Sequence, residues 1–340
     1  MKKVIVTGGA GFIGSNLVRF LIKKKIYTIV IDKLTYAAFP NSFKDIRNNN
    51  YFEFKKIDIA DRSKLKNLFE KYKPDSIFHL AAESHVDRSI SAPADFISTN
   101  ILGTYNLLDF AHLYWKTISQ KKKKIFKFLH VSTDEVYGAL GKDEKIFNEK
   151  SRYMPNSPYS ASKASSDHLV RAWNQTYDLP TIITNCTNNY GPYQNPEKLI
   201  PVIIMSAING KKIPIYGDGK QIRDWIHVED HVKGLYDVMN KGRIGKTYNI
   251  SSKCEKTNIN LANLICTIVE KKTGKKNLKK LINFVTDRPG HDRRYALDNK
   301  RIREELGWKP KIKFENGIKH TVEWYINNAD AWNKKLKRKI

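Results

Sequence analysis

Four polar side chains that could do acid/base chemistry follow an apolar run near the middle of the chain. Ser132, Thr133, Asp134 and Glu135 come directly after residues 128–131, which read as the end of a buried strand. Two adjacent carboxylates can act as an acid and a base when their surroundings separate their pKa values. Taken alone, an Asp-Glu pair more often caps a helix or lies solvated in a loop. Its neighbours in the fold therefore decide between the two interpretations.

A tyrosine and a lysine downstream form a second reactive pair. Tyr159 and Lys163 are four residues apart in a stretch, 159–177, that we expect to be helical, so both side chains lie on one helix face. The ammonium would lower the pKa of the phenol, ordinarily about 10, and make it available as a base. Any single Tyr-x-x-x-Lys can also be an exposed pair without chemistry. The position directly after Pro158, at the start of the helix, favours function.

A glycine-rich turn opens the chain and predicts a dinucleotide site. Gly8, Gly11 and Gly14 follow the strand-like stretch Lys3–Thr7, and a helix and a second strand ending at Asp32 come next. Strand, glycine turn, helix and an acid roughly 20 residues further on are the pattern of nucleotide-binding βαβ units. A carboxylate at Asp32 would accept hydrogen bonds from the adenosine ribose and repel a 2′-phosphate. We therefore predict NAD rather than NADP, and regard an ordinary glycine-rich turn as the weaker alternative.

The charge of the chain raises the question of nucleic-acid binding. The 340 residues carry a formal net charge of +27, but the lysines are scattered, with small clusters at 23–25, 121–124 and 334–339. Scattered charge indicates a solvated surface rather than a basic stripe, and it would also attract an anionic substrate. We therefore expect no nucleic-acid partner.

Composition also bounds the compartment. Mean hydropathy is −0.53, and we find no apolar run of the length that a membrane helix requires. Met1-Lys-Lys runs directly into a strand, which leaves no room for a signal peptide, so we expect a cytoplasmic protein without a membrane partner. The cysteines, Cys186, Cys254 and Cys266, lack metal-ligand spacing and read as small core or surface residues. His227 and His231 do not form H-E-x-x-H, so we expect no metal.

Alternating strands and helices predict a Rossmann-type, doubly wound parallel α/β sheet with a smaller C-terminal α/β lobe. We expect residues 1–190 to form the NAD-binding domain, with 226–252 returning to it, and 191–340 to form the substrate lobe. Within that lobe we expect helices at 261–271 and 314–332.

Several motifs resemble one enzyme family. The glycine turn, Asp32 and the Tyr159/Lys163 pair are similar to the extended short-chain dehydrogenase/reductase superfamily, and four further segments are similar to the dTDP-glucose 4,6-dehydratase family within it. The specific part is the triplet Thr133-Asp134-Glu135, since nucleotide-sugar epimerases of the superfamily share the glycines and the Tyr/Lys pair without the acidic pair. One departure is Ala38-Phe39, where the family usually has Gly-Asn. The four segments are Ala81–Ile90, Ser132–Gly138, Asn188–Pro192 and Asp287–Tyr295.

The resemblance implies dehydration of dTDP-glucose to dTDP-4-dehydro-6-deoxyglucose with bound NAD, an early step towards rhamnose and other deoxysugars. Tyr159 would take the C4 hydroxyl proton, assisted by Thr133 or Ser132, while hydride passes to NAD. Glu135 would then remove the C5 proton and Asp134 would protonate the departing C6 hydroxyl, before hydride returns to C6. Lys163 would support Tyr159.

The motifs and the resemblance together give two sets of binding residues. The cofactor set comprises Gly8, Gly11, Phe12, Ile13, Gly14, Asp32, Lys33, Thr35, Asp58, Ile59, Leu80, Ala81, Ala82, Ser84, Ser132, Tyr159, Lys163 and Asn189. The substrate set comprises His85, Arg88, Thr133, Asn188, Asn189, Glu197, Lys198, Leu199, Pro214, Tyr216, Arg223, Asn258, Arg288 and His291. Arg223 and Arg288 suit a diphosphate because guanidinium groups bind such oxygens bidentately, and Tyr216 could stack on the pyrimidine. Structural roles remain alternatives for His85, Arg88 and Glu197, and surface salt bridges remain the alternative for Arg223 and Arg288.

Rival interpretations remain open at this point. A UDP-sugar 4,6-dehydratase would differ in which nucleobase it recognises, and a nucleotide-sugar C4 epimerase would lack the elimination step. The preference for thymine or uracil depends on the pocket around Leu199 and Tyr216. A more distant alternative is a non-enzymatic, basic nucleic-acid-associated Rossmann protein. The resemblance also implies a homodimer formed by a four-helix bundle. Its apolar faces would be Leu107, Leu108 and Phe110 on one helix and Leu169, Val170 and Trp173 on another.

Overall fold

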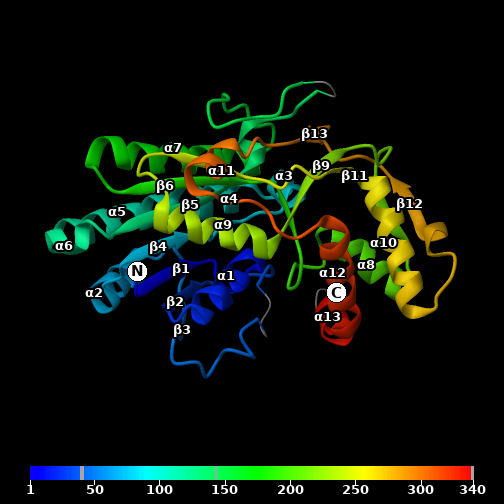
Figure 1. Ribbon diagram of the computed structural model, residues 1–340, viewed down its shortest axis with the longest axis horizontal. Helices are drawn as coiled ribbons and strands as arrows, with labels where there is room; N and C mark the ends of the chain where they lie inside the picture. The colour runs from blue at the N-terminus through cyan, green and yellow to red at the C-terminus, as the bar shows by residue number, and fades with distance from the viewer. Residues whose placement is uncertain (39–41, 142–143, 338–340) are drawn as a thin grey trace.

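A parallel sheet of seven strands forms the centre of the computed structural model, which describes residues 1–38, 42–141 and 144–337 (Figure 1). Phe39, which departs from the family pattern together with Ala38, lies outside these ranges, as do residues 338–339 of the basic tail. The strand order is β3-β2-β1-β4-β5-β6-β10, with parallel register throughout. The order reverses beside β1, which confirms the predicted doubly wound fold. The strands are β1 (Lys3–Thr7), β2 (Tyr27–Asp32), β3 (Phe52–Lys56), β4 (Ser76–His79), β5 (Lys127–Thr133), β6 (Thr181–Cys186) and β10 (Thr247–Ile250).

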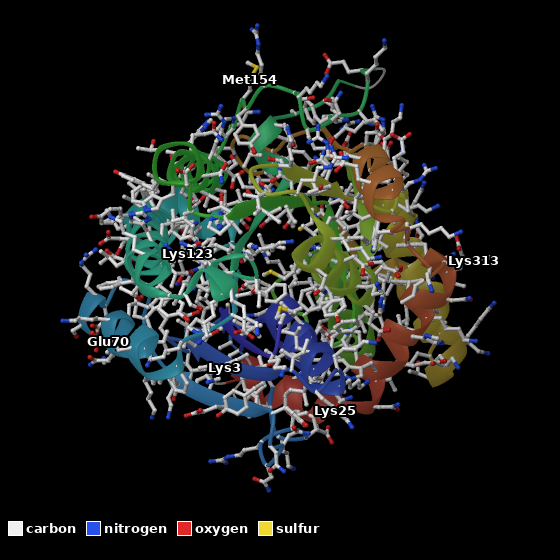
Figure 2. The ribbon with its side chains drawn as sticks, turned by 60° about the vertical axis from the view of Figure 1, so that its left-hand side comes forward. Lys3, Lys25, Glu70, Lys123, Met154 and Lys313 are labelled. Carbon is white, nitrogen blue, oxygen red and sulfur yellow. The ribbon has the colours of Figure 1, made fainter. Side chains whose placement is uncertain are left out.

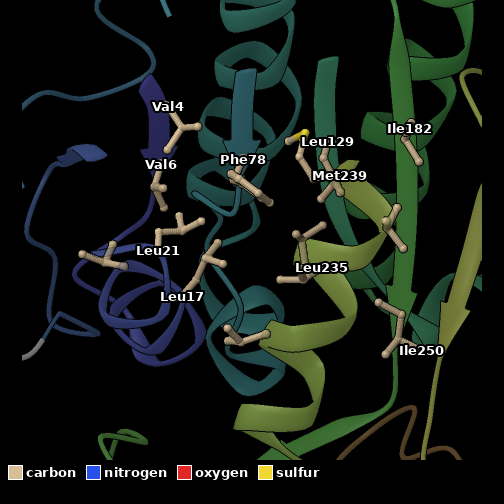
Figure 3. Close-up of a cluster of buried hydrophobic side chains, with 14 of the residues drawn as sticks. Val4, Val6, Leu17, Leu21, Phe78, Leu129, Ile182, Leu235, Met239 and Ile250 are labelled. Atoms are coloured by element: carbon tan, nitrogen blue, oxygen red, sulfur yellow. The ribbon is translucent and has the colours of Figure 1, made fainter. Parts of the chain in front are cut away.

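Helices cover both faces of this sheet. One face is packed by α1 (Phe12–Lys23), α9 (Val228–Lys241) and α11 (Lys300–Leu306), and the other by α2 (Arg62–Tyr72), α5 (Gly103–Thr117) and α7 (Pro158–Tyr177). The first layer is shown in Figure 3, where Leu17 of α1 and Leu235 of α9 face Phe78 and Leu129 of the strands. Apolar periodicity on each helix produces these layers, because a stripe of side chains three to four residues apart must be buried.

Leu235 offers a test of this core, since its side chain is fully buried. We expect Leu235→Ala to lower the free energy of unfolding by about 2–5 kcal/mol, through lost burial and a residual cavity. Ile244→Ala is the control, because Ile244 is 51% exposed and its truncation should change that free energy by less than about 0.5 kcal/mol. Urea unfolding of both variants measures the difference, and equal effects would contradict the described packing.

A second apolar core lies beside the sheet domain, at the right of Figure 1. Its helices are α8 (Leu199–Asn209), α10 (Asn258–Thr273), α12 (Phe314–Asn327) and α13 (Ala329–Lys337). Strand β9 (Ile222–His227) pairs with β7 (Asn188–Tyr190), β11 (Glu255–Thr257) and β13 (Arg294–Tyr295), while β8 (Ile213–Tyr216) pairs with β12 (Ile282–Val285). We call this part the C-terminal lobe.

The short elements lie in the connections. They are α3 (Val86–Ser91), α4 (Pro93–Phe96), the π-helical turn η1 (Ile97–Leu102), α6 (Gln120–Lys123), and the 3₁₀ turns η2 (Asp134–Tyr137) and η3 (Leu278–Leu281). No helix in the described ranges has the length and apolar character needed to cross a bilayer. Basic side chains are distributed widely, and Lys25, Lys123 and Lys313 lie in separate regions of Figure 2.

Two expectations about helices were wrong. The predicted single helix 314–332 is broken at Asn328, whose backbone leaves helical geometry between α12 and α13. This break turns Trp332 back onto Tyr325, with ring centroids 5.8 Å apart, so tertiary packing overrides the local pattern. In addition, Leu107, Leu108 and Val170 are fully buried against the sheet and are not available as an intersubunit face.

Candidate active site

A single cleft at the carboxyl ends of the parallel strands brings the reactive residues together. Every residue of the expected cofactor set lines it, as do the five expected catalytic residues, Thr133, Asp134, Glu135, Tyr159 and Lys163. The topology explains this convergence, since parallel strands end at one edge of the sheet and ligands bind there, where the strand order reverses.

The glycine turn between β1 and α1 lets two backbones approach closely. Gly8 has φ +65°, and a Cβ there would lie 2.6 Å from the backbone nitrogen of Ala81, at the end of β4. A Cβ on Gly14 would clash with the Gly8 carbonyl oxygen. Side chains at either position would therefore close the turn against which a pyrophosphate must lie.

Asp32 is held at the end of β2 by the same turn. Its Oδ2 accepts a hydrogen bond from the Ala10 amide at 3.0 Å, and Oδ1 accepts one from Leu34 at 2.8 Å. Burial raises the pKa of this carboxyl, and the two amide donors oppose the shift. The carboxylate is thus fixed in the position from which it could also accept a ribose hydroxyl.

Lys33 links the cofactor side of the cleft to a glutamate that the sequence did not single out. Its Nζ donates to Thr99 Oγ1 at 2.9 Å and lies 3.7 Å from Glu83 Oε1. The Glu83 backbone is fixed by Asn100, which accepts from its amide at 2.8 Å and donates to its carbonyl at 3.0 Å. Glu83 lies inside Ala81–Ile90, one of the segments that resemble the family, and this position could have identified it.

The two acidic residues form the start of η2, directly after β5. Thr133 Oγ1 donates to Asp134 Oδ1 at 3.2 Å, and Asp134 is 3% exposed with Oδ2 aimed at no protein donor in the described residues. Burial raises the pKa of Asp134 well above its usual range, and the charge of Glu135 adds to the shift. Asp134 is therefore the member of the pair that favours its protonated form.

Glu135 meets a different electrostatic environment. Burial raises its pKa as well, but Arg288, Arg223 and Lys198 all oppose that shift. The three cations favour its ionised form. The cleft thus gives two neighbouring carboxyl groups different electrostatic surroundings, which is the condition for giving them opposite proton-transfer roles.

Tyr159 and Lys163 begin α7, which starts where the sequence predicts. Ser157 caps the helix in a reciprocal arrangement with Ser160, and Pro158 occupies its first turn. Lys163 Nζ donates to the Val131 carbonyl at 2.9 Å and lies 3.3 Å from His130 Nε2. Both reactive side chains are at least nine-tenths buried.

The expected lowering of the Tyr159 pKa is not found in this cleft. Burial raises the pKa well above its usual range, and the negative charge of Glu135 adds to this, while the Thr133 hydroxyl opposes it. Burial also lowers the pKa of Lys163 to about 8. The predicted lowering relied on the positive charges of Lys163 and of a bound nicotinamide. Burial and the nearby carboxylate, which the sequence does not reveal, act in the opposite direction.

The expected substrate residues divide into two groups. Five of them line the cleft: Thr133, Asn188, Asn189, Glu197 and Lys198. The other nine, which are not among its lining residues, are His85, Arg88, Leu199, Pro214, Tyr216, Arg223, Asn258, Arg288 and His291.

Several of the nine nevertheless lie close to the acidic pair. Arg223 is buried, donates to the Asp292 carbonyl at 2.9 Å and lies over the Tyr295 ring. Arg288 ion-pairs with Asp87 across the two parts of the fold at 3.0 Å. Both arginines are near enough to act on the pKa of Glu135.

Asp87 also contacts β8, whose Tyr216 is predicted to stack on the pyrimidine of the substrate. The Tyr216 hydroxyl donates to its Oδ2 at 3.2 Å, and Tyr216 and Pro214 both face outward from β8. Charges of Lys198 and Glu197 reach His85, and His291 lies 2.5 Å from the Asp287 carboxylate. These residues therefore continue the cleft towards the C-terminal lobe.

The remaining three have structural contacts of their own. Arg88 lies 3.7 Å from the centre of the Tyr36 ring, and Leu199 starts α8 and packs against the core of the C-terminal lobe. Asn258 is buried at the start of α10, and its backbone amide donates to the backbone carbonyl of Gln221 at 3.0 Å.

Besides Glu83 and Thr99, polar lining residues absent from the predicted sets gather at the carboxyl end of β6 and just beyond it. They are Cys186, Thr187, Gln194 and Asn195. All flank the segment Asn188–Pro192, so the carboxyl end of β6 followed by that segment was the signal that could have identified them. His227 caps α9 and His231 lies 2.9 Å from Asn189, while the described part of the chain contains no metal-binding group of three or more His, Cys, Asp or Glu.

Comparisons with known proteins fit this geometry. The family model described as GDP-mannose 4,6-dehydratase matches residues 5–321. A dTDP-glucose 4,6-dehydratase of Haemophilus influenzae is 54% identical and covers 97% of this chain and 100% of its own, and one from Escherichia coli K12 is 52% identical over 96% and 93%.

Solved structures give the same result. A dTDP-glucose 4,6-dehydratase of Bacillus anthracis in complex with NAD has TM-score 0.87 and 42% identity, covering 98% of this chain and 100% of the other. Another from Streptomyces venezuelae, also with NAD bound, has TM-score 0.89 and 40% identity over 98% and 99%. A UDP-glucose 4-epimerase of Thermotoga maritima has TM-score 0.85 but 30% identity over 96% and 99%. The chain therefore belongs to the GDP-mannose 4,6-dehydratase family, and within it to the family of dTDP-glucose 4,6-dehydratases.

Proposed function

We propose that this chain uses bound NAD to convert dTDP-glucose into dTDP-4-dehydro-6-deoxyglucose by removing water across C5 and C6. The observation that carries this is the cleft itself, where the dinucleotide turn, the Tyr159/Lys163 pair and the Asp134/Glu135 pair meet. An epimerase needs the first two, but only an elimination needs a second acid and base. The relatives of highest identity given above are named for this reaction.

The first step is oxidation at C4. Tyr159 takes the proton of the C4 hydroxyl, Thr133 hydrogen-bonds the same oxygen, and Lys163 supplies positive charge beside the phenolate. NAD, when bound along Gly8, Gly14 and Asp32, supplies the hydride acceptor and later the donor. The resulting ketone makes the C5 proton acidic, which an unactivated carbon would not be.

The acidic pair performs the elimination. Glu135, whose ionised form is favoured by Arg288, Arg223 and Lys198, removes the C5 proton. Asp134, kept protonated by burial and by its charged neighbour, donates a proton to the departing C6 hydroxyl. After hydride returns to C6, Glu135 gives its proton back to C5, so the cofactor ends the cycle oxidised.

The C-terminal lobe holds the nucleotide in this proposal. Residues 1–190 with 226–252 bind NAD, and 191–340 bind the nucleotide sugar, with Arg223, Arg288 and Lys198 facing the diphosphate. Asn188, Asn189, Asn258 and His291 support them, and Tyr216 stacks on the base. Arg88, Leu199 and Pro214 contribute from the rim.

Product analysis tests the proposal against its rivals. The purified enzyme should convert dTDP-glucose labelled with deuterium at C4 into a product 18 Da lighter that carries the deuterium at C6, as read by mass spectrometry with fragmentation. Conversion of UDP-glucose instead would support the UDP-sugar dehydratase. A product of unchanged mass with inverted C4 would support the epimerase, and either result would overturn the proposal.

Asp32 makes a prediction about the cofactor. Asp32→Asn keeps the shape but removes the charge that ribose hydroxyls bind, so the affinity for NAD should fall about tenfold or more. Affinity for NADP should fall less, because repulsion of the 2′-phosphate is also removed. Calorimetric titration of cofactor-stripped protein measures both, with the surface variant Asp109→Asn as control. An unchanged ratio of the two affinities would contradict the assigned role.

We further propose a cytoplasmic homodimer. Because Leu107, Leu108 and Val170 are buried, the contact would use exposed residues of η1, α5 and α7 such as Leu102, Leu113 and Tyr177, together with the partly buried Phe110, Leu169 and Trp173. The free thiols of Cys186, Cys254 and Cys266 suit the reducing cytosol. Light scattering that gives the mass of one chain would refute the dimer.

A further inference from the structure

A buried carboxylate one helical turn beyond Lys163 has no part in the steps above. Asp167 on α7 is 2% exposed, and its Oδ2 accepts hydrogen bonds from the Ser132 hydroxyl at 2.8 Å and the Tyr153 hydroxyl at 2.9 Å. Burying a carboxylate is costly unless hydrogen bonds and a nearby cation compensate it. The two hydroxyls supply the hydrogen bonds but not the cation.

His130 on β5 contacts both this carboxylate and Lys163 through one ring nitrogen. Its Nε2 is 3.2 Å from Asp167 Oδ1 and 3.3 Å from Lys163 Nζ. Burial lowers the pKa of His130 well below its usual range, so the ring is neutral and does not balance the carboxylate. The compensating cation is therefore the ammonium of Lys163, which lies beside the same ring nitrogen.

The two charges act on each other as a pair. Burial raises the pKa of Asp167 to about 6, and Lys163 is the largest opposing influence. Burial lowers the pKa of Lys163 to about 8, and Asp167 is the largest influence that opposes that shift. Each residue thus favours the charged form of the other.

We propose that Asp167 is a positioning residue for Lys163, which its negative charge holds in the cleft and in the charged form, while His130 contacts both residues. This inference rests on the proposed function, because oxidation at C4 relies on the ammonium beside Tyr159. Lys163 also donates to the Val131 carbonyl, so contacts from β5 and a charge from α7 together fix the amine.

Other ionisable groups around Lys163 do not replace this charge. His79 on β4 and Cys186 on β6 interact with the charge of Lys163, and Tyr159, Asp134 and Glu135 line the same cleft. Tyr153 donates to Asp167 itself. Burial keeps His79 neutral and raises the pKa of Cys186 to about 12. Asp134 favours its protonated form, and Glu135 faces the arginines.

Asp167→Asn removes the charge and keeps the shape, so it tests the proposal directly. The ligand-free protein, labelled with ¹³C at lysine Cε, is titrated by NMR, and Lys163→Met assigns the resonance. The Lys163 midpoint should fall by about one pH unit or more, the usual size of the effect of a nearby opposite charge. Ser166→Ala, a buried neighbour on α7 that donates to two carbonyls, should leave the midpoint in place.

A kinetic measurement follows the same residue. Lysine is charged below its pKa, so a lower midpoint means that the alkaline limb of the C4-oxidation rate, read as absorbance at 340 nm, moves to lower pH in Asp167→Asn. Tyr153→Phe removes one hydrogen bond to Asp167 Oδ2 and so raises the pKa of Asp167. The Lys163 midpoint should therefore also fall in Tyr153→Phe, but by less than in Asp167→Asn. This second variant decides the matter if Asp167→Asn does not fold.

An unchanged Lys163 midpoint in folded Asp167→Asn, or in Tyr153→Phe when the first variant fails, would overturn the inference. Equal shifts in Asp167→Asn and Ser166→Ala would reduce Asp167 to general packing and would overturn it as well. Because the titration uses no substrate, absence of turnover with dTDP-glucose would count against the proposed function alone.

Discussion

Replacing Tyr159 by phenylalanine should lower the turnover number for dTDP-glucose by about 10²–10⁴-fold, the contribution of a positioned acid/base group. The variant loses the hydroxyl and keeps the ring, which packs edge-to-face on Phe96 at 6.2 Å. Stability and NAD content should therefore stay close to those of the parent protein. Rapid mixing should show that absorbance at 340 nm no longer rises, because C4 is not oxidised.

Tyr248→Phe is the matched control for that variant. Tyr248 on β10 is also buried, and its hydroxyl donates to Glu305 on α11 at 2.8 Å. Tyr248 is not among the residues that line the cleft. Its loss should leave turnover within about twofold and act, if at all, on stability. Turnover of Tyr159→Phe equal to that of Tyr248→Phe would remove Tyr159 from the reaction.

The sequence predicted the sheet and the cleft because both depend on local patterns. Strand, glycine turn and helix are short-range features, and parallel strands must end at one edge, so Asp32, Thr133 and Tyr159 converge without any knowledge of distant contacts. The acidic pair gained its meaning from this convergence. Alone, the pair was better explained as a helix cap or as two solvated loop residues.

What the sequence did not predict depends on contacts between distant segments. The ion pair of Asp87 with Arg288 joins residues 201 positions apart, and no spacing rule points to it. The break at Asn328 follows from the packing of Trp332 on Tyr325, and the burial of Leu107 follows from how α5 lies on the sheet. The direction of the Tyr159 pKa was missed for the same reason, since burial is a property of the whole fold.

Glu135→Gln and Asp134→Asn should stop the reaction at two different points after oxidation. Without the Glu135 carboxylate nothing removes the C5 proton, so Glu135→Gln should accumulate reduced cofactor at 340 nm and lose turnover by about 10²–10⁴-fold. In deuterated water it should also lose exchange at C5. Glu144→Gln, in an exposed loop, is the control and should retain both activities.

Asp134→Asn should behave differently because only the acid is lost. Thr133 can still donate to the remaining amide oxygen, as it does to Asp134 Oδ1, so the geometry of η2 is kept. Glu135 can still remove the C5 proton, and exchange at C5 should continue while departure of the C6 hydroxyl slows by a similar factor. If Asp134→Asn lost exchange and Glu135→Gln kept it, the two roles would be reversed. Full turnover in both variants would leave the cleft with the machinery of an epimerase and no means of eliminating water.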